Sequence, residues 1–156
     1  MKNLLLILLL IASFSSYAQQ TDNTNEEQIK ALVNQFFEAL EKKDTVLLKN
    51  TTMAEAQIWV RRTHETPASA TMRFVENDIQ RLHGGRPVKE IGLDFDINVH
   101  NGVAAAWVPY EFWVEGEFSH CGIDIFTLFE IDDVWKIVSI AYSIEKENCD
   151  QLPVTR

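Results

Sequence analysis

The chain has 156 residues and a formal net charge of −9, with 14 basic against 23 acidic side chains. This length allows a single domain with a sizeable hydrophobic core. An acidic chain with no basic stripe argues against nucleic acid or an anionic membrane surface as a partner.

The N-terminus is typical of a cleavable signal peptide. Lys2 gives it a positive start, Leu4 to Ile11 form an apolar core too short to span a bilayer, and Ser16-Tyr17-Ala18 is a cleavage signal. We therefore expect an exported protein, periplasmic or secreted, that begins at Gln19 and does not insert into the membrane after cleavage. Four segments are predicted: a signal peptide (1–18), a flexible leader (19–25), a single domain (26–147) and a C-terminal tail (148–156).

The first half of the domain is predicted to be mostly helical. Glu26 to Lys42 carries apolar side chains at helical spacing, which predicts an amphipathic helix that covers a sheet. Asp44 is expected to cap a short second helix that ends near Asn50. Gln57 to Arg62 is predicted to be a short strand, and Met72 to Leu82 a third helix.

The second half predicts four antiparallel strands in a meander, because its apolar runs are separated by turn residues. The strands are Lys89–Val99, Val103–Val114, Phe118–Ile131 and Val134–Ile144. The turns are His100-Asn101-Gly102, Glu115-Gly116 and Asp132-Asp133, whose residues include types that tolerate positive φ.

Two-residue turns would place Glu111 opposite His120, and Asp124 opposite Ala141. One face would then combine aromatic with ionisable side chains, a mixture typical of a lined pocket. That face would hold Trp107, Glu111, Trp113, Phe118, His120, Asp124, Phe126, Leu128, Trp135 and Ile137. Pro109 has no amide hydrogen for the ladder, so it predicts an edge or a bulge, and a bulge would turn half of its strand over.

The two cysteines leave two alternatives open. Export to an oxidising compartment favours a disulfide between Cys121 and Cys149, which would tie the tail to the sheet. The alternative is two separate thiols, buried or free. Neither these cysteines nor the four scattered histidines have the close spacing of a metal site, so we expect no metal.

The order of elements resembles the nuclear transport factor 2-like superfamily, which includes ketosteroid isomerase, scytalone dehydratase and polyketide cyclases. Val134 to Val138 is similar to the last strand of many members, and Ser119 to Asp124 with the late Cys149 resembles small secreted members. The resemblance implies an α+β fold, with N-terminal helices packed in the concavity of a strongly curved antiparallel sheet. This cone would enclose a pocket lined by one sheet face. The resemblance also implies a homodimer through the outer face, and no catalytic residue is carried over from it.

Glu111, His120 and Asp124 are the candidate catalytic residues. A carboxylate beside an imidazole can act as a general acid–base couple, or it can be a structural pair. Asp124 has apolar neighbours, so its pKa would be raised and it could act as a general base, unless it bonds to a helix cap or to Arg61. The candidate ligand-binding residues are Trp59, Arg61, Trp107, Trp113 and Phe126, although aromatic side chains in a sheet also serve as core.

Three functions follow from this sequence. The first is a protein that binds a small apolar or aromatic molecule in the cone. The second is an isomerase, dehydratase or cyclase that needs no cofactor. The third is an accessory domain that binds a protein partner through the outer sheet face. The chain has no nucleotide-binding loop and no nucleophile elbow, which disfavours kinases and the common hydrolases.

Overall fold

The computed structural model describes residues 24–63 and 65–154. The predicted signal peptide (1–18) lies outside these residues, as does most of the predicted leader (19–25). Residues 24–42 form a helix, called the N-terminal helix below, so the last two residues of the predicted leader are helical instead.

The N-terminal helix is followed by two short helices and seven strands. The helices are α2 (Thr45–Thr51) and α3 (Val75–Arg81), with single 3-10 turns at Leu82–Gly84 and Cys149–Gln151. The strands are β1 (Thr52–Arg62), β2 (Ser69–Phe74), β3 (Val88–Gly92), β4 (Asp96–His100), β5 (Val103–Val114), β6 (Glu117–Ile131) and β7 (Val134–Ile144). As predicted, Asp44 caps α2, and its carboxylate accepts from the amides of Val46 and Leu47 at 2.9 Å.

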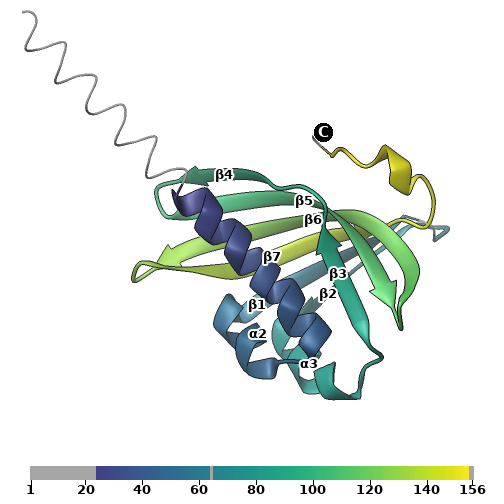
Figure 1. Ribbon diagram of the computed structural model, residues 1–156, viewed down its shortest axis with the longest axis horizontal. Helices are drawn as coiled ribbons and strands as arrows, with labels where there is room; N and C mark the ends of the chain where they lie inside the picture. The colour runs from purple at the N-terminus through teal and green to yellow at the C-terminus, as the bar shows by residue number, and fades with distance from the viewer. Residues whose placement is uncertain (1–23, 64, 155–156) are drawn as a thin grey trace, which may run out of the picture.

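The strands form one curved sheet in the order β2-β1-β7-β6-β5-β3, and β4 pairs with β5 beside β3 (Figure 1). The sheet is mixed rather than antiparallel throughout, because β1 and β7 run parallel. These two strands are separated by most of the domain, so no hairpin imposes an antiparallel pairing on them. The predicted α+β cone is confirmed in its architecture.

The three predicted hairpin turns are confirmed. Their central residues are Asn101-Gly102, Glu115-Gly116 and Asp132-Asp133, and all six have φ between 52° and 85°. Two successive positive φ values make a type I′ turn, whose twist matches that of the flanking strands.

The predicted strand Lys89–Val99 is wrong as a single element, because it is broken into β3 and β4. Both halves pair with β5, and the chain between them leaves the ladder opposite Pro109. The carbonyl oxygen of Pro109 accepts from the amide of Leu93 at 2.8 Å, so its missing amide hydrogen faces this break. The chain bends close to the core at Gly92, where a Cβ would lie 2.8 Å from the Phe95 ring.

The predicted third helix is wrong over its first residues. Ser69–Phe74 is strand β2, which pairs with β1 from Gln57 to Arg62, and the helix begins only at Val75. The side chain of Asn77 accepts from the amide of Phe74 at 3.2 Å and so stabilises this start.

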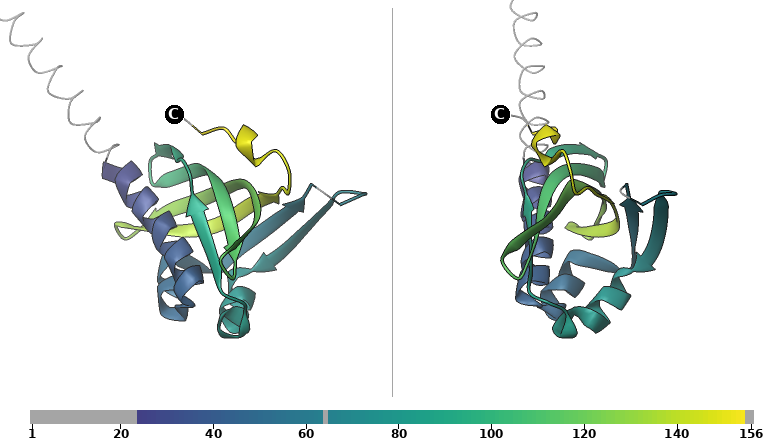
Figure 2. Two further views of the ribbon diagram at one scale, coloured as in Figure 1. Left: turned by 45° about the vertical axis from the view of Figure 1, so that its right-hand side comes forward. Right: turned by 90° about the vertical axis from the view of Figure 1, so that its right-hand side faces the viewer.

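The N-terminal helix lies across the concave face of the sheet (Figures 1 and 2). Its Phe36 and Phe37 rings meet Phe126 of β6 edge to face, with centroids 5.9 Å apart in both pairs. Phe126 has no exposed surface. This residue, a candidate for ligand binding, is therefore part of the core between helix and sheet.

Tyr110 lies in a close contact that joins three strands. It is paired with Gly122 of β6, and its hydroxyl donates to the carbonyl oxygen of Ser143 in β7 at 2.7 Å. A Cβ on Gly122 would overlap that carbonyl oxygen and come within 2.9 Å of the Tyr110 ring. Gly122 therefore lets the tyrosine lie flat over the sheet.

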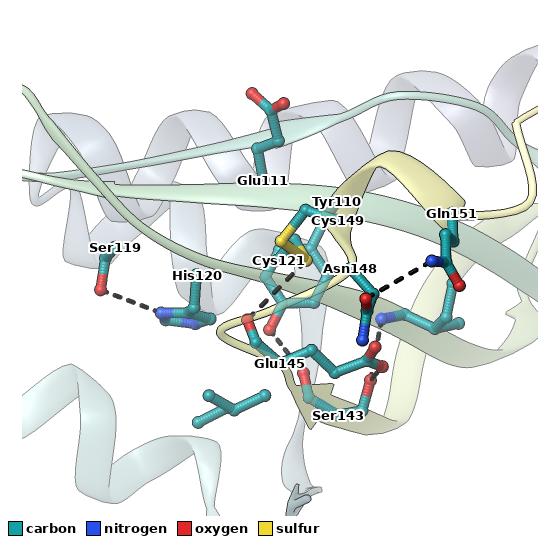
Figure 3. The surroundings of a disulfide bond; sticks show 12 residues. Tyr110, Glu111, Ser119, His120, Cys121, Ser143, Glu145, Asn148, Cys149 and Gln151 are labelled. Atoms are coloured by element: carbon teal, nitrogen blue, oxygen red, sulfur yellow. Dashed lines mark hydrogen bonds between the residues drawn. A yellow bond between two sulfur atoms is a disulfide. The ribbon is translucent and has the colours of Figure 1, made fainter. Parts of the chain in front are cut away.

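A disulfide joins Cys121 of β6 to Cys149, with 5.8 Å between the two Cα atoms (Figure 3). Cys121 also pairs through its backbone with Glu145, just after β7. The disulfide thus holds the start of the C-terminal tail against the sheet.

Loss of this disulfide should lower the stability of the fold. It closes a loop with a sequence separation of 28 residues, so Cys149→Ser should reduce the free energy of unfolding by about 2–4 kcal/mol. Denaturant titration with and without a reductant measures this loss. The wild type should weaken on reduction and the variant should not respond. Equal midpoints for the oxidised and reduced wild type would contradict the stabilising role.

Gly122→Ala should destabilise the domain by about 1–3 kcal/mol, because the added methyl group meets a backbone oxygen that cannot turn away. Gly84→Ala is the matched control, since nothing lies within 4 Å of a Cβ there. The control should change stability by less than about 0.5 kcal/mol in the same thermal and denaturant unfolding experiments. Equal effects of the two substitutions would rule out the close contact.

Candidate ligand-binding cavity

The predicted pairing of Glu111 with His120 is wrong. The structure pairs Glu111 with Cys121 and Phe112 with His120, and the register shifts between Phe112 and Trp113. This bulge changes the pairing by one residue, so Glu111 and His120 point to opposite faces of the sheet.

A second bulge, between Thr127 and Leu128, shifts the β6–β7 pairing. Asp124 consequently lies opposite Tyr142 and not opposite Ala141. Its neighbour on the other side is Val108. Asp124 therefore points to the concave face, in a row of inward-facing side chains.

The three tryptophans among the candidate ligand-binding residues lie on the outer face of the sheet instead. Trp59 and Trp107 are 46% and 43% exposed, and they border a shallow groove together with Ile123 and Ile125. Trp113 donates from its indole nitrogen to the carboxylate of Glu111 at 3.3 Å. Trp107 and Trp113 were predicted from a β5–β6 register that the bulge after Phe112 shifts by one residue.

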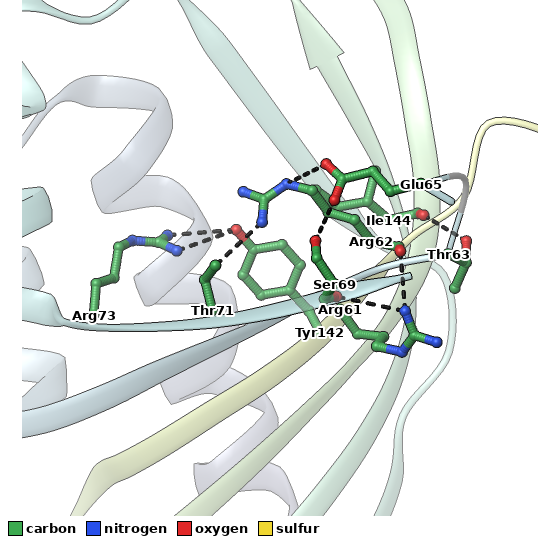
Figure 4. A network of polar contacts seen from close by, with 9 residues as sticks. All are labelled: Arg61, Arg62, Thr63, Glu65, Ser69, Thr71, Arg73, Tyr142 and Ile144. Atoms are coloured by element: carbon green, nitrogen blue, oxygen red, sulfur yellow. Dashed lines mark hydrogen bonds and ion pairs between the residues drawn. The ribbon is translucent and has the colours of Figure 1, made fainter. Parts of the chain in front are cut away.

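Arg61 also lies away from Asp124. Its guanidinium donates to the carbonyl oxygens of Arg62 and Ser69, at 3.0 and 3.4 Å, beside the loop that joins β1 to β2 (Figure 4). Arg61 is exposed, so the alternative in which Asp124 bonds to Arg61 is wrong.

The concave face holds a cavity of about 430 Å³ between the sheet, the N-terminal helix and α3. Most of its wall is apolar, and eight ionisable side chains also line it. The apolar and aromatic lining comprises Phe36, Leu40, Ile58, Leu82, Val88, Tyr110, Phe112, Val114, Ile140, Tyr142 and Ile144. The polar lining comprises Lys43, Arg73, Asp78, Arg81, Arg86, Glu90, His120 and Asp124.

Asp124 is the most deeply buried of these ionisable groups. Its residue is 3% exposed, and its Oδ2 atom has no hydrogen-bond partner among the described residues. Burial raises the pKa of Asp124 well above its ordinary value, and the nearby Glu90 carboxyl raises it further. This shift favours the protonated form of Asp124, and its Oδ2 is left for a ligand to bond.

Glu90 is a second cavity carboxyl, and the sequence analysis missed it. Burial raises the pKa of Glu90 to about 8, although Arg73 acts in the opposite direction. The single strand predicted for residues 89–99 placed Glu90 on the solvent-facing side of the sheet. The break before β4 reverses the alternation, so Glu90 of β3 points inward and so do Ile97 and Val99 of β4.

Arg73 was also missed, because its segment was predicted to be helical. In β2 it pairs with the inward-facing Ile58, and so it reaches the cavity. Its Nε donates to both carboxylate oxygens of Asp78, at 2.7 and 2.9 Å, and its terminal nitrogens lie 3.4 Å from the Tyr142 hydroxyl (Figure 4). The alternation of Ala70, Met72 and Phe74 was the signal for a strand here.

His120 forms one side of the cavity. Its ring stacks on Phe112 with centroids 4.8 Å apart and meets Tyr110 edge to face. The Nδ1 atom lies 3.1 Å from the Ser119 hydroxyl (Figure 3). These contacts fix the orientation of the imidazole at the cavity wall.

Within residues 24–63 and 65–154, no group of three or more His, Cys, Asp or Glu side chains is arranged to hold a metal ion. Nor is any helix of this part of the chain both long and apolar enough to cross a membrane.

Solved structures with the same fold share little sequence with this chain. A nuclear transport factor 2-like superfamily protein from Salmonella enterica is 16% identical, with a TM-score of 0.64 over 81% of this chain and 95% of that one. A "putative dehydratase" from Streptomyces avermitilis is 16% identical, with a TM-score of 0.61 over 79% and 97%. The β subunit of a "putative aromatic-ring-hydroxylating dioxygenase" from Novosphingobium aromaticivorans is 8% identical, with a TM-score of 0.67 over 82% and 94%.

At such identities these likenesses show the fold alone. No curated protein matches the chain. One family model, described as "Putative lumazine-binding", matches residues 24–143, which is nearly the whole described domain. The fold and this match both fit the binding of a small molecule. The chain therefore belongs to the "Putative lumazine-binding" family of the nuclear transport factor 2-like superfamily.

Proposed function

We propose that this protein binds a small, planar, largely apolar heterocycle in the cavity of the cone. The observation that carries this proposal is Asp124, a buried acid whose Oδ2 has no partner among the described residues and which lines a mainly apolar cavity. A buried polar atom without a partner is costly, and a ligand that bonds to it removes that cost.

A neutral carboxyl group presents an O–H donor beside a C=O acceptor. It can therefore form two parallel hydrogen bonds with a ligand edge that offers an N–H next to a C=O. The pyrimidinedione ring of lumazine has such edges, and the name of the family suggests this class of molecule.

The remaining walls suit a flat ring system. Phe36, Ile58 and Ile140 are each at most 5% exposed and offer no polar side-chain atom. The volume of about 430 Å³ lies within the usual range for small-molecule sites, about 300–1,000 Å³.

A cofactor-free acid–base enzyme is the second candidate. It is favoured by the presence of Asp124, Glu90 and His120 in one cavity, because a carboxyl group such as Glu90, whose pKa is raised to about 8, suits general acid–base chemistry. A dehydration is one such reaction, and the Streptomyces avermitilis neighbour is described as a "putative dehydratase".

We also infer export and self-association. Residues 1–18 have the pattern of a signal peptide, and the Cys121–Cys149 disulfide is of the kind found in oxidising compartments. The exposed Trp59 and Trp107 on the outer face favour a homodimer through that face, or a different protein partner as the third candidate function.

Substitutions of Asp124 test the binding mode. Asp124→Leu removes both hydrogen bonds and should weaken binding of lumazine by about 10- to 100-fold. Asp124→Asn keeps a donor beside an acceptor, so it should retain binding. Wild-type binding should weaken as pH rises and Asp124 loses its proton, whereas binding by Asp124→Asn should not show this dependence. Calorimetric and fluorescence titrations measure both, with the ionisation of free lumazine recorded separately.

Asp96→Asn serves as the matched control, since Asp96 is exposed and lies on β4. It should leave the affinity unchanged. Equal affinity of the wild type and Asp124→Leu would overturn the proposed site. If the wild type converts a bound molecule and Asp124→Asn binds the same molecule without converting it, the protein is an acid–base enzyme and not only a binding protein.

The stability of the ligand-free protein should fall as pH rises. The folded protein keeps the Glu90 proton up to about pH 8, whereas the unfolded chain releases it near 4.5. The contribution of protonated Glu90 to the free energy of unfolding is complete below about pH 4.5. It is lost as pH rises to about 8, by up to about 1.4 kcal/mol per pH unit.

Denaturant unfolding across this pH range measures the effect. Glu90→Gln should flatten the decline, and Asp124 should account for the part that remains. Glu117→Gln in the exposed β5–β6 hairpin is the control and should keep the wild-type slope. A Glu90→Gln variant with the full wild-type slope would contradict burial of this carboxyl group.

A further inference from the structure

The cavity has a closed end and an open end. Asp124, Ile58 and Ile140 line its closed end and are almost fully buried. At the open end, the lining side chains come from the C-terminal end of the N-terminal helix, from the end of α3, and from the segment before β3. Figure 2 shows these three segments together at one end of the molecule. We call this end the mouth.

Three cationic side chains line the mouth: Lys43, Arg81 and Arg86. Each comes from a different one of these segments. The whole chain has 14 basic and 23 acidic residues, so a local group of three cations runs against its overall charge. Such a local field attracts an anion even on an acidic protein.

The protein neutralises these cations only weakly. Arg81 makes no ion pair or side-chain hydrogen bond within the described residues, and Lys43 donates to the carbonyl oxygen of Gly85. Arg86 faces Glu115 at 3.8 Å. Both side chains are more than half exposed, so solvent screens this ion pair and its interaction energy is small.

The acidic groups nearby have partners or lie deeper. Asp78 is held by Arg73, and Glu41 faces Lys89 at 3.9 Å. Glu90 lines the interior of the cavity. The mouth therefore keeps a net positive charge, and Arg73 does not contribute to it because Asp78 offsets its charge.

We propose that the ligand carries an anionic group, and that Arg81, with Lys43 and Arg86, binds this group at the mouth while Asp124 bonds the opposite end of the ring. This inference rests on the proposed binding function. It narrows the ligand to heterocycles with a carboxylate or similar anion at the end remote from their donor–acceptor edge.

Two related probes test the proposal: lumazine and its 6-carboxylate. Both share the pyrimidinedione edge, and only the second carries an anion on the other ring. The wild-type protein should bind the carboxylate about tenfold more tightly than lumazine, with a preference that shrinks as salt is added. Calorimetric titration of each probe at low and high salt measures this.

Arg81→Gln should remove most of the preference, by weakening the carboxylate about five- to tenfold and lumazine less than twofold. Lys49→Gln is the matched control, because Lys49 is an exposed base in the last turn of α2 and does not line the cavity. It causes the same loss of charge and should leave the preference intact. A role of Arg81 confined to the end of α3 would change the thermal midpoint and not the ratio of affinities.

The outcomes separate this inference from the function it rests on. Equal binding of both probes, or a preference that survives Arg81→Gln, overturns the inference and leaves the binding function standing. Failure of both probes to bind overturns the proposed heterocycle and this inference with it. A preference lost in Arg81→Gln and kept in Lys49→Gln supports both.

Discussion

The interior of this cone depends on a carboxyl group held where it cannot easily ionise. Asp124 lies among apolar walls, with no hydrogen-bond partner for Oδ2 among the described residues, and Glu90 enters the same cavity from β3. Burial disfavours the ionised form of an acid in such a place, so the pKa of Asp124 is raised. The remaining features of the cavity serve a ligand that meets a neutral acid: apolar walls, an imidazole fixed by stacking, and cations kept at the mouth.

The two faces of the sheet carry different kinds of side chain. The concave face is covered by the N-terminal helix over one part and left open over another, and ionisable groups gather in the open part. The convex face carries Trp59, Ile125 and Trp107, all partly exposed, in a row that crosses four strands, with Ala141 of β7 between Trp59 and Ile125. Polar chemistry inside and apolar surface outside are consistent with a ligand in the cone and a protein partner on the outer face.

Much of the fold was predictable from the sequence. The turn pairs such as Asn101-Gly102, the cap at Asp44 and the apolar runs of β5 to β7 each have a local chemical cause, and each was correctly placed. The site was less predictable, because a bulge moves every later side chain to the other face. One such shift after Phe112 separated Glu111 from His120, and the break opposite Pro109 turned Glu90 inward. Pro109 indicated a possible bulge, but the shift lies three residues later, after Phe112, where the sequence carries no such signal. Of the three candidate catalytic residues, Asp124 and His120 therefore line the cavity and Glu111 does not.

The protonation state of Asp124 in the free protein is the most direct test. Carboxyl carbon NMR spectra recorded across a pH titration, with Asp124→Asn to assign the signal, report it without any ligand. We expect the Asp124 signal to be that of a neutral acid at neutral pH and to titrate well above the range usual for aspartate. A signal that titrates near the ordinary value of 3.8 would show an ionised, solvated carboxylate and would rule out a protonated Asp124 in the cavity.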